Sequence, residues 1–124
     1  MRALVIDDSR AMRSILRRTL AELGFEVEEA GHGQEAIDLL TTGEALPDVC
    51  LVDWNMPVMN GLEFVSAVRR TKEWRQITLM MVTTESEHSQ VVRALAAGAH
   101  EYVIKPFTGD AIVDKLNLLG LVDA

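Results

Sequence analysis

The stretch Ala3-Leu4-Val5-Ile6-Asp7-Asp8 decides the fold, because four consecutive apolar residues are followed at once by two aspartates. Such a short apolar run is typical of a buried β-strand. Three later runs have the same form and end at a polar residue, namely 49–52 before Asp53, 79–82 before Thr83 and 102–104 before Lys105. Apolar strands separated by helical patterns predict a parallel sheet, and ligands bind beyond the carboxyl ends of its strands. We therefore expect these polar side chains to converge on one edge of the sheet.

The segments between these runs have helical spacing. Ser9 can cap a first helix that ends before Gly24, with Arg13, Arg17 and Arg18 on its outer face. Apolar residues that recur about every 3.6 positions predict its inner face, and they are Met12, Ile15, Leu16, Leu20 and Leu23. The other predicted elements are a strand at 26–30 and helices at 34–42, 62–71, 88–97 and 109–119. The expected inner positions of the helix at 88–97 are Val91, Val92 and Leu95.

Five strands that alternate with five helices predict a doubly wound α/β fold of the flavodoxin-like kind. Right-handed crossovers place helices on both faces of the sheet, which gives three layers, α/β/α. The common order for five such strands is 2-1-3-4-5. With this order the first and third strands are neighbours, so Asp7 and Asp8 would lie beside Asp53.

The composition indicates a single domain over residues 1–124, with no output domain. Hydrophobic residues make up 48% and charged residues 25% of the chain, as is ordinary for a globular protein. The net charge of -7 argues against nucleic acid as a partner. The apolar run after Arg2 is too short for a signal peptide or a membrane span, and Cys50 is the only cysteine. We expect a cytoplasmic monomer that does not bind membranes.

Three neighbouring carboxylates at one edge create strong repulsion. Two unit charges about 4 Å apart repel by roughly 4 kcal/mol at an effective dielectric constant near 20, so the cluster must take up protons, open to water or bind a cation. Carboxylates with a backbone carbonyl and water suit Mg²⁺, with Mn²⁺ as an alternative, and no nearby His or Cys indicates zinc. Mg²⁺ beside a lysine and a hydroxyl is suited to phosphoryl transfer, with Asp53 as the candidate nucleophile.

The motifs also resemble a known family over essentially the whole chain. They are Asp7-Asp8, Asp53-Trp54-Asn55-Met56-Pro57 with Gly61, Thr83, and Tyr102 followed by Lys105-Pro106-Phe107. Each motif is weak alone, but all of them in this order at strand ends resemble the receiver domain of two-component response regulators, and most closely its stand-alone chemotaxis members. The resemblance implies a signalling phosphoacceptor that catalyses only its own phosphorylation and dephosphorylation, and so not an enzyme in the usual sense.

The resemblance implies a role for each matching position. Asp53 would accept a phosphoryl group from the phosphohistidine of a CheA-like sensor histidine kinase. Asp8 and Asp53 would ligate Mg²⁺ directly, Asp7 would do so mostly through water, and the backbone carbonyl of Asn55 would complete the protein ligands. Lys105 would pair with the phosphoryl group and Thr83 would donate a hydrogen bond to it. The resemblance also implies a cis peptide bond before Pro106.

The resemblance further implies an output surface. Tyr102 would turn inward as Thr83 moves, and this would change the face made by the helix at 88–97, the strand at 102–104 and the helix at 109–119. A flagellar motor switch protein or another protein target would bind that face. Glu87 and His88 stand where chemotaxis members commonly carry lysines. The motor, another target and a dedicated phosphatase therefore all stay open as partners.

Three positions bear on the lifetime of the phosphoryl group. In the family, the residues two past the acceptor and two past the threonine flank the path of the hydrolytic water, and here they are Asn55 and Glu85. This pair is typical of quickly reset chemotaxis regulators, so we expect a short-lived phosphoryl group. Thr84 replaces the small residue common beside the threonine, and its branched side chain could restrict access to the site.

Alternatives from other classes stay open. A flavodoxin-like cofactor binder shares the fold, but Asp7-Asp8-Ser9 would repel an FMN phosphate where a Ser/Thr/Gly-rich loop is needed. A Mg²⁺-dependent phosphohydrolase would use the same acids, but it would turn over substrate repeatedly, whereas a receiver labels itself once. Within the receiver family, a phosphorelay outside chemotaxis or a phosphate sink is the alternative.

Overall fold

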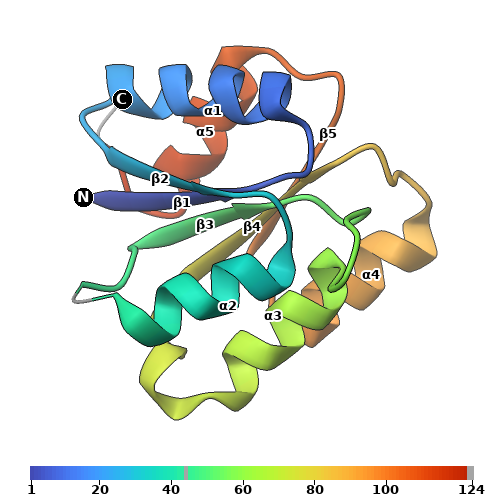
Figure 1. Ribbon diagram of the computed structural model, residues 1–124. Coiled ribbons are helices and arrows are strands. Elements are labelled where there is room, and N and C mark those ends of the chain that lie inside the picture. The colour runs from blue at the N-terminus through green and yellow to red at the C-terminus, as the bar shows by residue number, and fades with distance from the viewer. Residues whose placement is uncertain (44, 123–124) are drawn as a thin grey trace.

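The computed structural model describes residues 1–43 and 45–122. Within these residues, five strands alternate with five α-helices (Figure 1). The strands are β1 (Arg2–Ile6), β2 (Glu26–Ala30), β3 (Val49–Val52), β4 (Thr78–Thr83) and β5 (Glu101–Ile104). The helices are α1 (Arg10–Glu22), α2 (Gly33–Thr42), α3 (Gly61–Arg70), α4 (His88–Ala97) and α5 (Gly109–Leu118). A 3₁₀ turn, η1 (Lys72–Trp74), lies between α3 and β4, where the sequence predicts only a connection.

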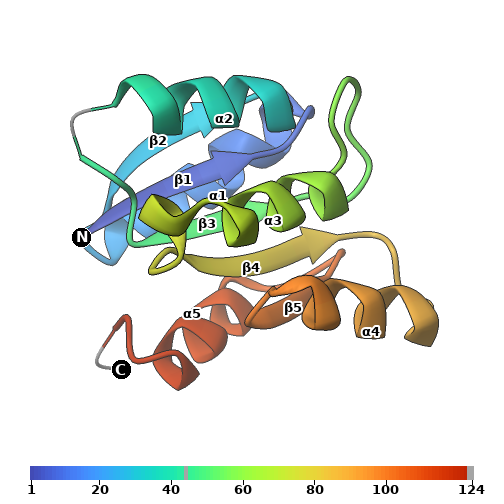
Figure 2. The same cartoon turned by 90° about the horizontal axis from the view of Figure 1, so that it is seen from below.

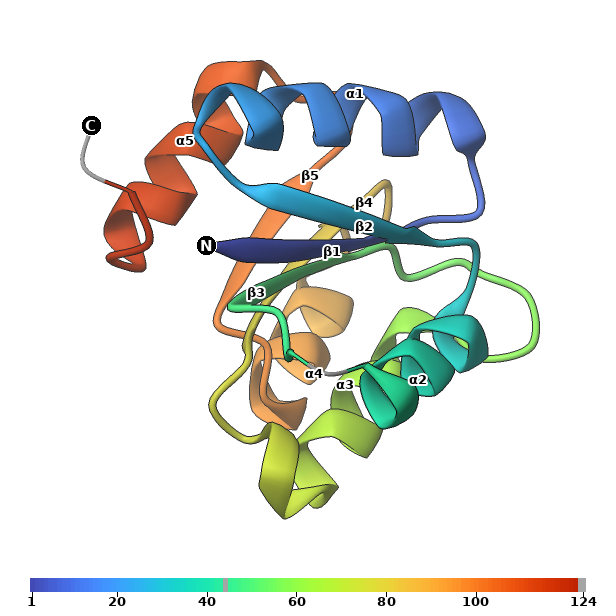
Figure 3. The same ribbon diagram turned by 60° about the vertical axis from the view of Figure 1, so that its left-hand side comes forward.

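The strands form one parallel sheet in the order β2-β1-β3-β4-β5, which confirms the predicted fold class. Helices α1 and α5 cover one face of this sheet, and α2, α3 and α4 cover the other (Figures 1 and 3). Figure 2 shows α3 over the middle of the sheet, between α2 and α4. Among the described residues, no helix has both the length and the apolar character that crossing a membrane requires.

The core is divided by the sheet into two halves. Because side chains alternate along a strand, Leu4 and Ile6 of β1 pack with α2, α3 and α4, whereas Ala3 and Val5 pack with α1 and α5. Phe64 of α3 is fully buried on the first side. Both faces of the sheet are therefore covered by packed helices, and the loops at the carboxyl edge extend from buried strands.

Two helices bury only part of the apolar face that spacing predicts. In α1, Ile15 is 49% exposed, so its expected burial was wrong. In α4, Val92 is 48% and Leu95 44% exposed, whereas Ala94 is fully buried. The apolar stripe of each helix is wider than the strip it buries, and the 3.6-residue period does not say which edge stays outside.

Arg69 joins the amino ends of β4 and β5. Its guanidinium donates to the backbone oxygens of Gly98 at 3.0 Å, Arg75 at 3.1 Å and Ile77 at 3.0 Å. It also lies 3.1 Å from Nδ1 of His100, and the same nitrogen accepts from the Leu79 N–H at 3.1 Å. Because Nδ1 accepts a hydrogen bond, the folded structure favours the neutral imidazole.

Stability is expected to fall on mild acidification because of His100. Burial, together with the charge of Arg69, lowers the pKa of His100 below its usual value of 6.5. As pH falls, His100 of the unfolded chain takes up a proton before His100 of the folded chain does. The stability that neutral His100 contributes is therefore fully present above about pH 6.5 and is lost as pH falls toward the lower folded pKa. Urea unfolding at pH 8 and pH 5.5 measures it. His100→Asn keeps an acceptor without the titration, and an undiminished pH dependence in this variant would contradict the assignment.

Candidate functional site

The strand register places the two halves of the acidic cluster side by side. Ile6 of β1 pairs with Val52 of β3, so the next residues, Asp7 and Asp53, are neighbours at the carboxyl edge. The Asp53 N–H continues the sheet by donating to the Ile6 oxygen at 2.9 Å. Asp8 follows Asp7 directly. The predicted strand order therefore brings these acids together.

Strands β4 and β5 bring the hydroxyl and the ammonium to the same edge. Thr83 is the last residue of β4 and pairs with Ile104. Lys105 follows β5, and its N–H donates to the Thr83 oxygen at 2.8 Å. The Lys105–Pro106 peptide bond is cis.

The three carboxylates form a compact, all-oxygen cluster. One oxygen from each of Asp7, Asp8 and Asp53 lies within 4.8 Å of the other two. Asp7 is 1% and Asp53 7% exposed, whereas Asp8 is open to solvent. Ligand oxygens at about 2.1 Å from one Mg²⁺ ion are at most about 4.2 Å apart. Small side-chain rotations would therefore bring the three carboxylate oxygens within reach of one ion. The donor set and its size fit a hard divalent cation.

Lys105 partly offsets the negative charge. Its Nζ lies 2.7 Å from Oδ2 of Asp7 and 3.8 Å from Oδ2 of Asp53. Burial nevertheless raises the pKa of Asp53, an effect that the Thr83 hydroxyl and Lys105 oppose and that Asp7 strengthens. A buried carboxylate in this state gains from a further positive charge.

Glu85 links the residues predicted to switch and to tune hydrolysis. Its N–H donates to Oγ1 of Thr83 at 3.4 Å, and its backbone oxygen accepts from the Tyr102 hydroxyl at 2.6 Å. Its side chain accepts a hydrogen bond from the Asn55 amide. Tyr102 is 9% exposed, and Thr84 points into solvent. The backbone of Glu85 thus connects Thr83 to Tyr102, so a movement of Thr83 would displace the hydrogen-bond acceptor of the Tyr102 hydroxyl.

One backbone hydrogen bond and a helix cap fix the loop that carries Asn55. The Gly61 N–H donates to the Trp54 oxygen at 2.9 Å. Asn60 caps α3 by accepting from the Glu63 N–H at 2.8 Å, while the Glu63 side chain accepts from the Asn60 N–H at 3.1 Å. This reciprocal pair is a capping box, which sets the start of α3 against the acceptor strand.

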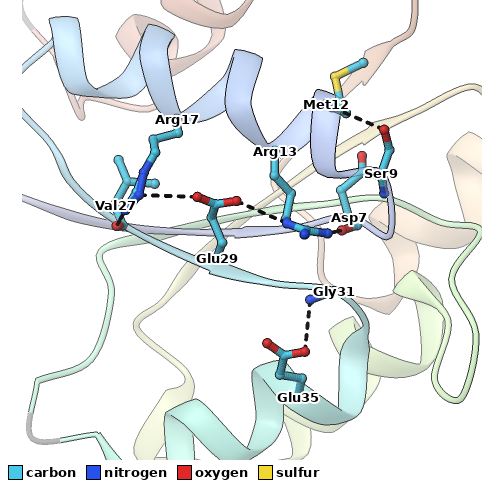
Figure 4. Close-up of polar contacts among 9 residues, drawn as sticks. All are labelled: Asp7, Ser9, Met12, Arg13, Arg17, Val27, Glu29, Gly31 and Glu35. Carbon is cyan, nitrogen blue, oxygen red and sulfur yellow. Dashed lines mark hydrogen bonds and ion pairs between the residues drawn. The ribbon is translucent and has the colours of Figure 1, made fainter.

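Arg13 differs from its prediction. The sequence pattern puts it on the outer face of α1, but its side chain is only 18% exposed and its Nη1 donates to the backbone oxygen of Asp7 at 2.6 Å (Figure 4). Its Nε donates to Glu29 of β2 at 3.1 Å. The four-residue spacing of Arg13 and Arg17 puts both on one side of α1, but only the structure shows that this side faces Glu29.

Comparison with known proteins shows the family to which this fold and its acidic edge belong. Residues 3–117 match the model of the response regulator receiver domain, and the chain belongs to this family. Among curated relatives, a chemotaxis protein CheY homolog of Campylobacter jejuni is 49% identical over 117 residues, covering 94% of this chain and 89% of the relative. Chemotaxis protein CheY1 of Helicobacter pylori is 44% identical over 120 residues, covering 96% of each.

Solved structures agree with this assignment. The chemotaxis response regulator CheY4 of Vibrio cholerae superimposes with a TM-score of 0.86 at 36% identity, covering 95% of this chain and 97% of that one. A response regulator of Chloroflexus aurantiacus gives a TM-score of 0.88 at 28% identity, with 96% and 97% covered. The chain is thus a receiver domain of the CheY type, and these relatives support a chemotaxis response regulator.

Proposed function

We propose that this chain carries a signal by accepting a phosphoryl group on Asp53 from the phosphohistidine of a CheA-like sensor histidine kinase. The observation that carries this proposal is the edge cluster itself, in which three acid oxygens lie within 4.8 Å of one another beside Lys105 and Thr83. Structural roles alone do not explain buried, crowded carboxylates at the ends of two central strands. Membership of the receiver family supports the same role.

The reaction requires a nucleophile and a balance of charge. An oxygen of Asp53 would form the new bond to phosphorus while the bond from phosphorus to the donor imidazole nitrogen breaks and its electron pair leaves with the imidazole. Lys105, which now pairs with Asp7 at 2.7 Å, would contact a phosphoryl oxygen, and Thr83 would donate its hydroxyl to another. Both groups sit at the edge before the phosphoryl group arrives.

The metal site follows from the same residues. We propose that Asp7, Asp8, Asp53 and the backbone carbonyl of Asn55 hold Mg²⁺, with Mn²⁺ as a substitute of similar ligand preference. When bound, the ion neutralises charge that builds up on the phosphoryl oxygens. The same positive charge would also favour ionised Asp53, whose pKa is raised by burial.

The output would be delivered by protein contact at the face formed by α4, β5 and α5. Val92, Leu95 and Ile104 are exposed apolar residues of this face, at 48%, 44% and 43%. Tyr102 of β5 is tied to Glu85 and through it to Thr83, so phosphorylation would alter this face. We propose a flagellar motor switch protein as the target, with a regulator of another phosphorelay or a phosphate sink as the alternative.

The phosphoryl group is expected to last seconds to minutes, because Asn55 and Glu85 flank the proposed path of the attacking water. In support of this, their side chains are hydrogen bonded to each other, and they lie two residues after Asp53 and Thr83 respectively. The measurement is the decay of labelled protein after removal of the donor at neutral pH. A half-life of hours would contradict the prediction and would point to restricted access past Thr84.

Acetyl phosphate with Mg²⁺ tests the proposed function directly. We expect the intact mass to rise by one phosphoryl group per chain, and the rise should disappear when the metal is chelated. Trp54, next to Asp53, should change its emission with metal and again with label. Labelling that does not need a divalent cation, or that exceeds one group per chain, would refute the proposal.

The same experiment separates a receiver from a phosphohydrolase. A hydrolase would release phosphate from many equivalents of an added phosphomonoester without keeping a label, whereas a receiver consumes donor only as fast as its own label decays. Sustained turnover of a phosphomonoester would favour the hydrolase.

A further inference from the structure

We propose that Arg13 is a positioning residue for the metal site and acts through the backbone carbonyl of Asp7. The inference rests on the proposed function, because it concerns how the acidic cluster is held in the geometry that Mg²⁺ needs. Arg13 itself touches neither the metal nor the reacting atoms in this account.

Asp7 is hydrogen bonded through both its backbone and its side chain. Its N–H donates to the Ala30 oxygen at 3.1 Å. Its carboxylate accepts from the Ser9 N–H at 2.9 Å and from Lys105 Nζ at 2.7 Å. Its backbone oxygen accepts from Arg13 Nη1 at 2.6 Å. Asp7 is 1% exposed, so these protein groups replace water as its partners.

The backbone oxygen of Asp7 needs a side-chain donor because of its place at the end of β1. The pairing of β1 with β2 ends at Ile6 and Ala30, and its pairing with β3 ends at Ile6 and Val52. The Asp7 oxygen lies one residue beyond this pairing, where the ladder of strand N–H groups has stopped. The guanidinium of Arg13 supplies the donor at that point, from a helix on the other side of the loop (Figure 4).

The same carbonyl also affects the orientation of Asp8. The Asp7 oxygen belongs to the planar peptide group that joins Asp7 to Asp8. A donor that fixes the direction of this oxygen also fixes the plane from which the Asp8 side chain departs. Arg13 therefore sets the relative orientation of one buried and one exposed carboxylate of the cluster.

Arg13 is itself held in place by the carboxylate of Glu29. Its Nε donates to Glu29 Oε1 at 3.1 Å, with 18% of the Arg13 and 29% of the Glu29 side chain exposed. Arg17 Nη1 donates to the other carboxylate oxygen at 3.3 Å (Figure 4). A guanidinium has donors on several sides, so Arg13 reaches Glu29 and Asp7 at once, which the single ammonium of a lysine would not do equally well.

Positioning and simple charge effects predict opposite results. If Arg13 acted only through its charge, removing that charge beside the acids would tighten Mg²⁺ binding. If it positions the peptide between the acids, removing it weakens binding, and loss of such outer contacts commonly costs a metal site about 10-fold in affinity. Arg17 is the matched control, since it also contacts Glu29 and donates to a backbone oxygen, that of Val27 at 2.8 Å.

The test measures Mg²⁺ binding to the metal-free full chain by isothermal titration calorimetry. We expect Arg13→Gln to weaken binding about 10-fold and Arg13→Lys to weaken it less. Arg17→Gln removes the same charge but no contact with Asp7, and should change the affinity far less than Arg13→Gln does. With acetyl phosphate, Arg13→Gln should need more Mg²⁺ for half-maximal labelling but regain the wild-type rate at saturating Mg²⁺. A residue that only stabilised the fold would not produce this separation.

Each outcome decides the inference. Circular dichroism without metal shows which variants are folded, and Arg13→Lys decides the question if Arg13→Gln is not. Wild-type affinity or tighter binding in a folded Arg13 variant overturns the inference, and so does an equal loss in Arg17→Gln. If the wild-type chain binds Mg²⁺ and becomes labelled, and folded Arg13→Gln has the same Mg²⁺ affinity, only this inference is wrong. A wild-type chain that does neither defeats the proposed function as well.

Discussion

Asp53→Asn is expected to abolish labelling by acetyl phosphate and to make the metal-free chain more stable at neutral pH. The amide keeps the shape of the carboxyl group but is a poor nucleophile, so the intact mass should not change. Burial raises the pKa of Asp53 above its usual value of 3.8, so the folded protein binds this proton more tightly than the unfolded chain. Ionised Asp53 therefore lowers stability at neutral pH, and the variant removes that effect.

The pH dependence gives the sign of this stability effect. As pH falls through the raised pKa of Asp53, the wild-type carboxyl becomes neutral and the advantage of the variant should shrink. Urea unfolding in the presence of a chelator, at pH 7.5 and at progressively lower pH, measures the difference. Asp38→Asn, an exposed carboxyl on α2, is the control and should keep both labelling and stability. Labelling retained in Asp53→Asn would refute Asp53 as the acceptor.

Gly61→Ala is expected to destabilise the chain by about 2–3 kcal/mol, as insertion of a methyl group into a closed space typically does. A Cβ atom at Gly61 would collide with the backbone oxygen of Asp53 and would come within 3.0 Å of the Met81 side chain. The oxygen belongs to backbone that is held beside β1, because the Asp53 N–H is bonded to Ile6. The strain therefore falls on the acceptor itself.

The matched control for this substitution is Gly109→Ala. Gly109 begins α5, and among the described residues no atom beyond its chain neighbours and the backbone of its own helix lies within 4 Å of a Cβ built there. Gly109→Ala should change the free energy of unfolding by less than about 1 kcal/mol, measured by the same urea unfolding. Gly61→Ala should in addition slow labelling by acetyl phosphate. Equal unfolding midpoints for the two variants would contradict the role assigned to the close approach at Gly61.

Much of the fold could be predicted because it depends on local patterns. Each short apolar run is long enough to be a strand, and each polar residue that follows a run must emerge where the strand ends. The strand order was predicted as the common solution of a doubly wound sheet, and the structure has it. The contacts between Glu85, Tyr102 and Asn55 were outside such reasoning, since they join three separate loops and strands at the level of single atoms.

The sequence by itself determined which side chains stand at the carboxyl ends of the strands, because that placement needs only the period and length of the apolar runs. The tertiary structure alone decided what those side chains touch. Arg13 shows the difference most clearly: its helical position predicts solvent, but the packing of α1 on β1 and β2 brings its guanidinium to a carbonyl left beyond the sheet pairing. Val92 and Leu95 show the reverse, since an apolar pattern cannot say how much of it a neighbouring element will cover.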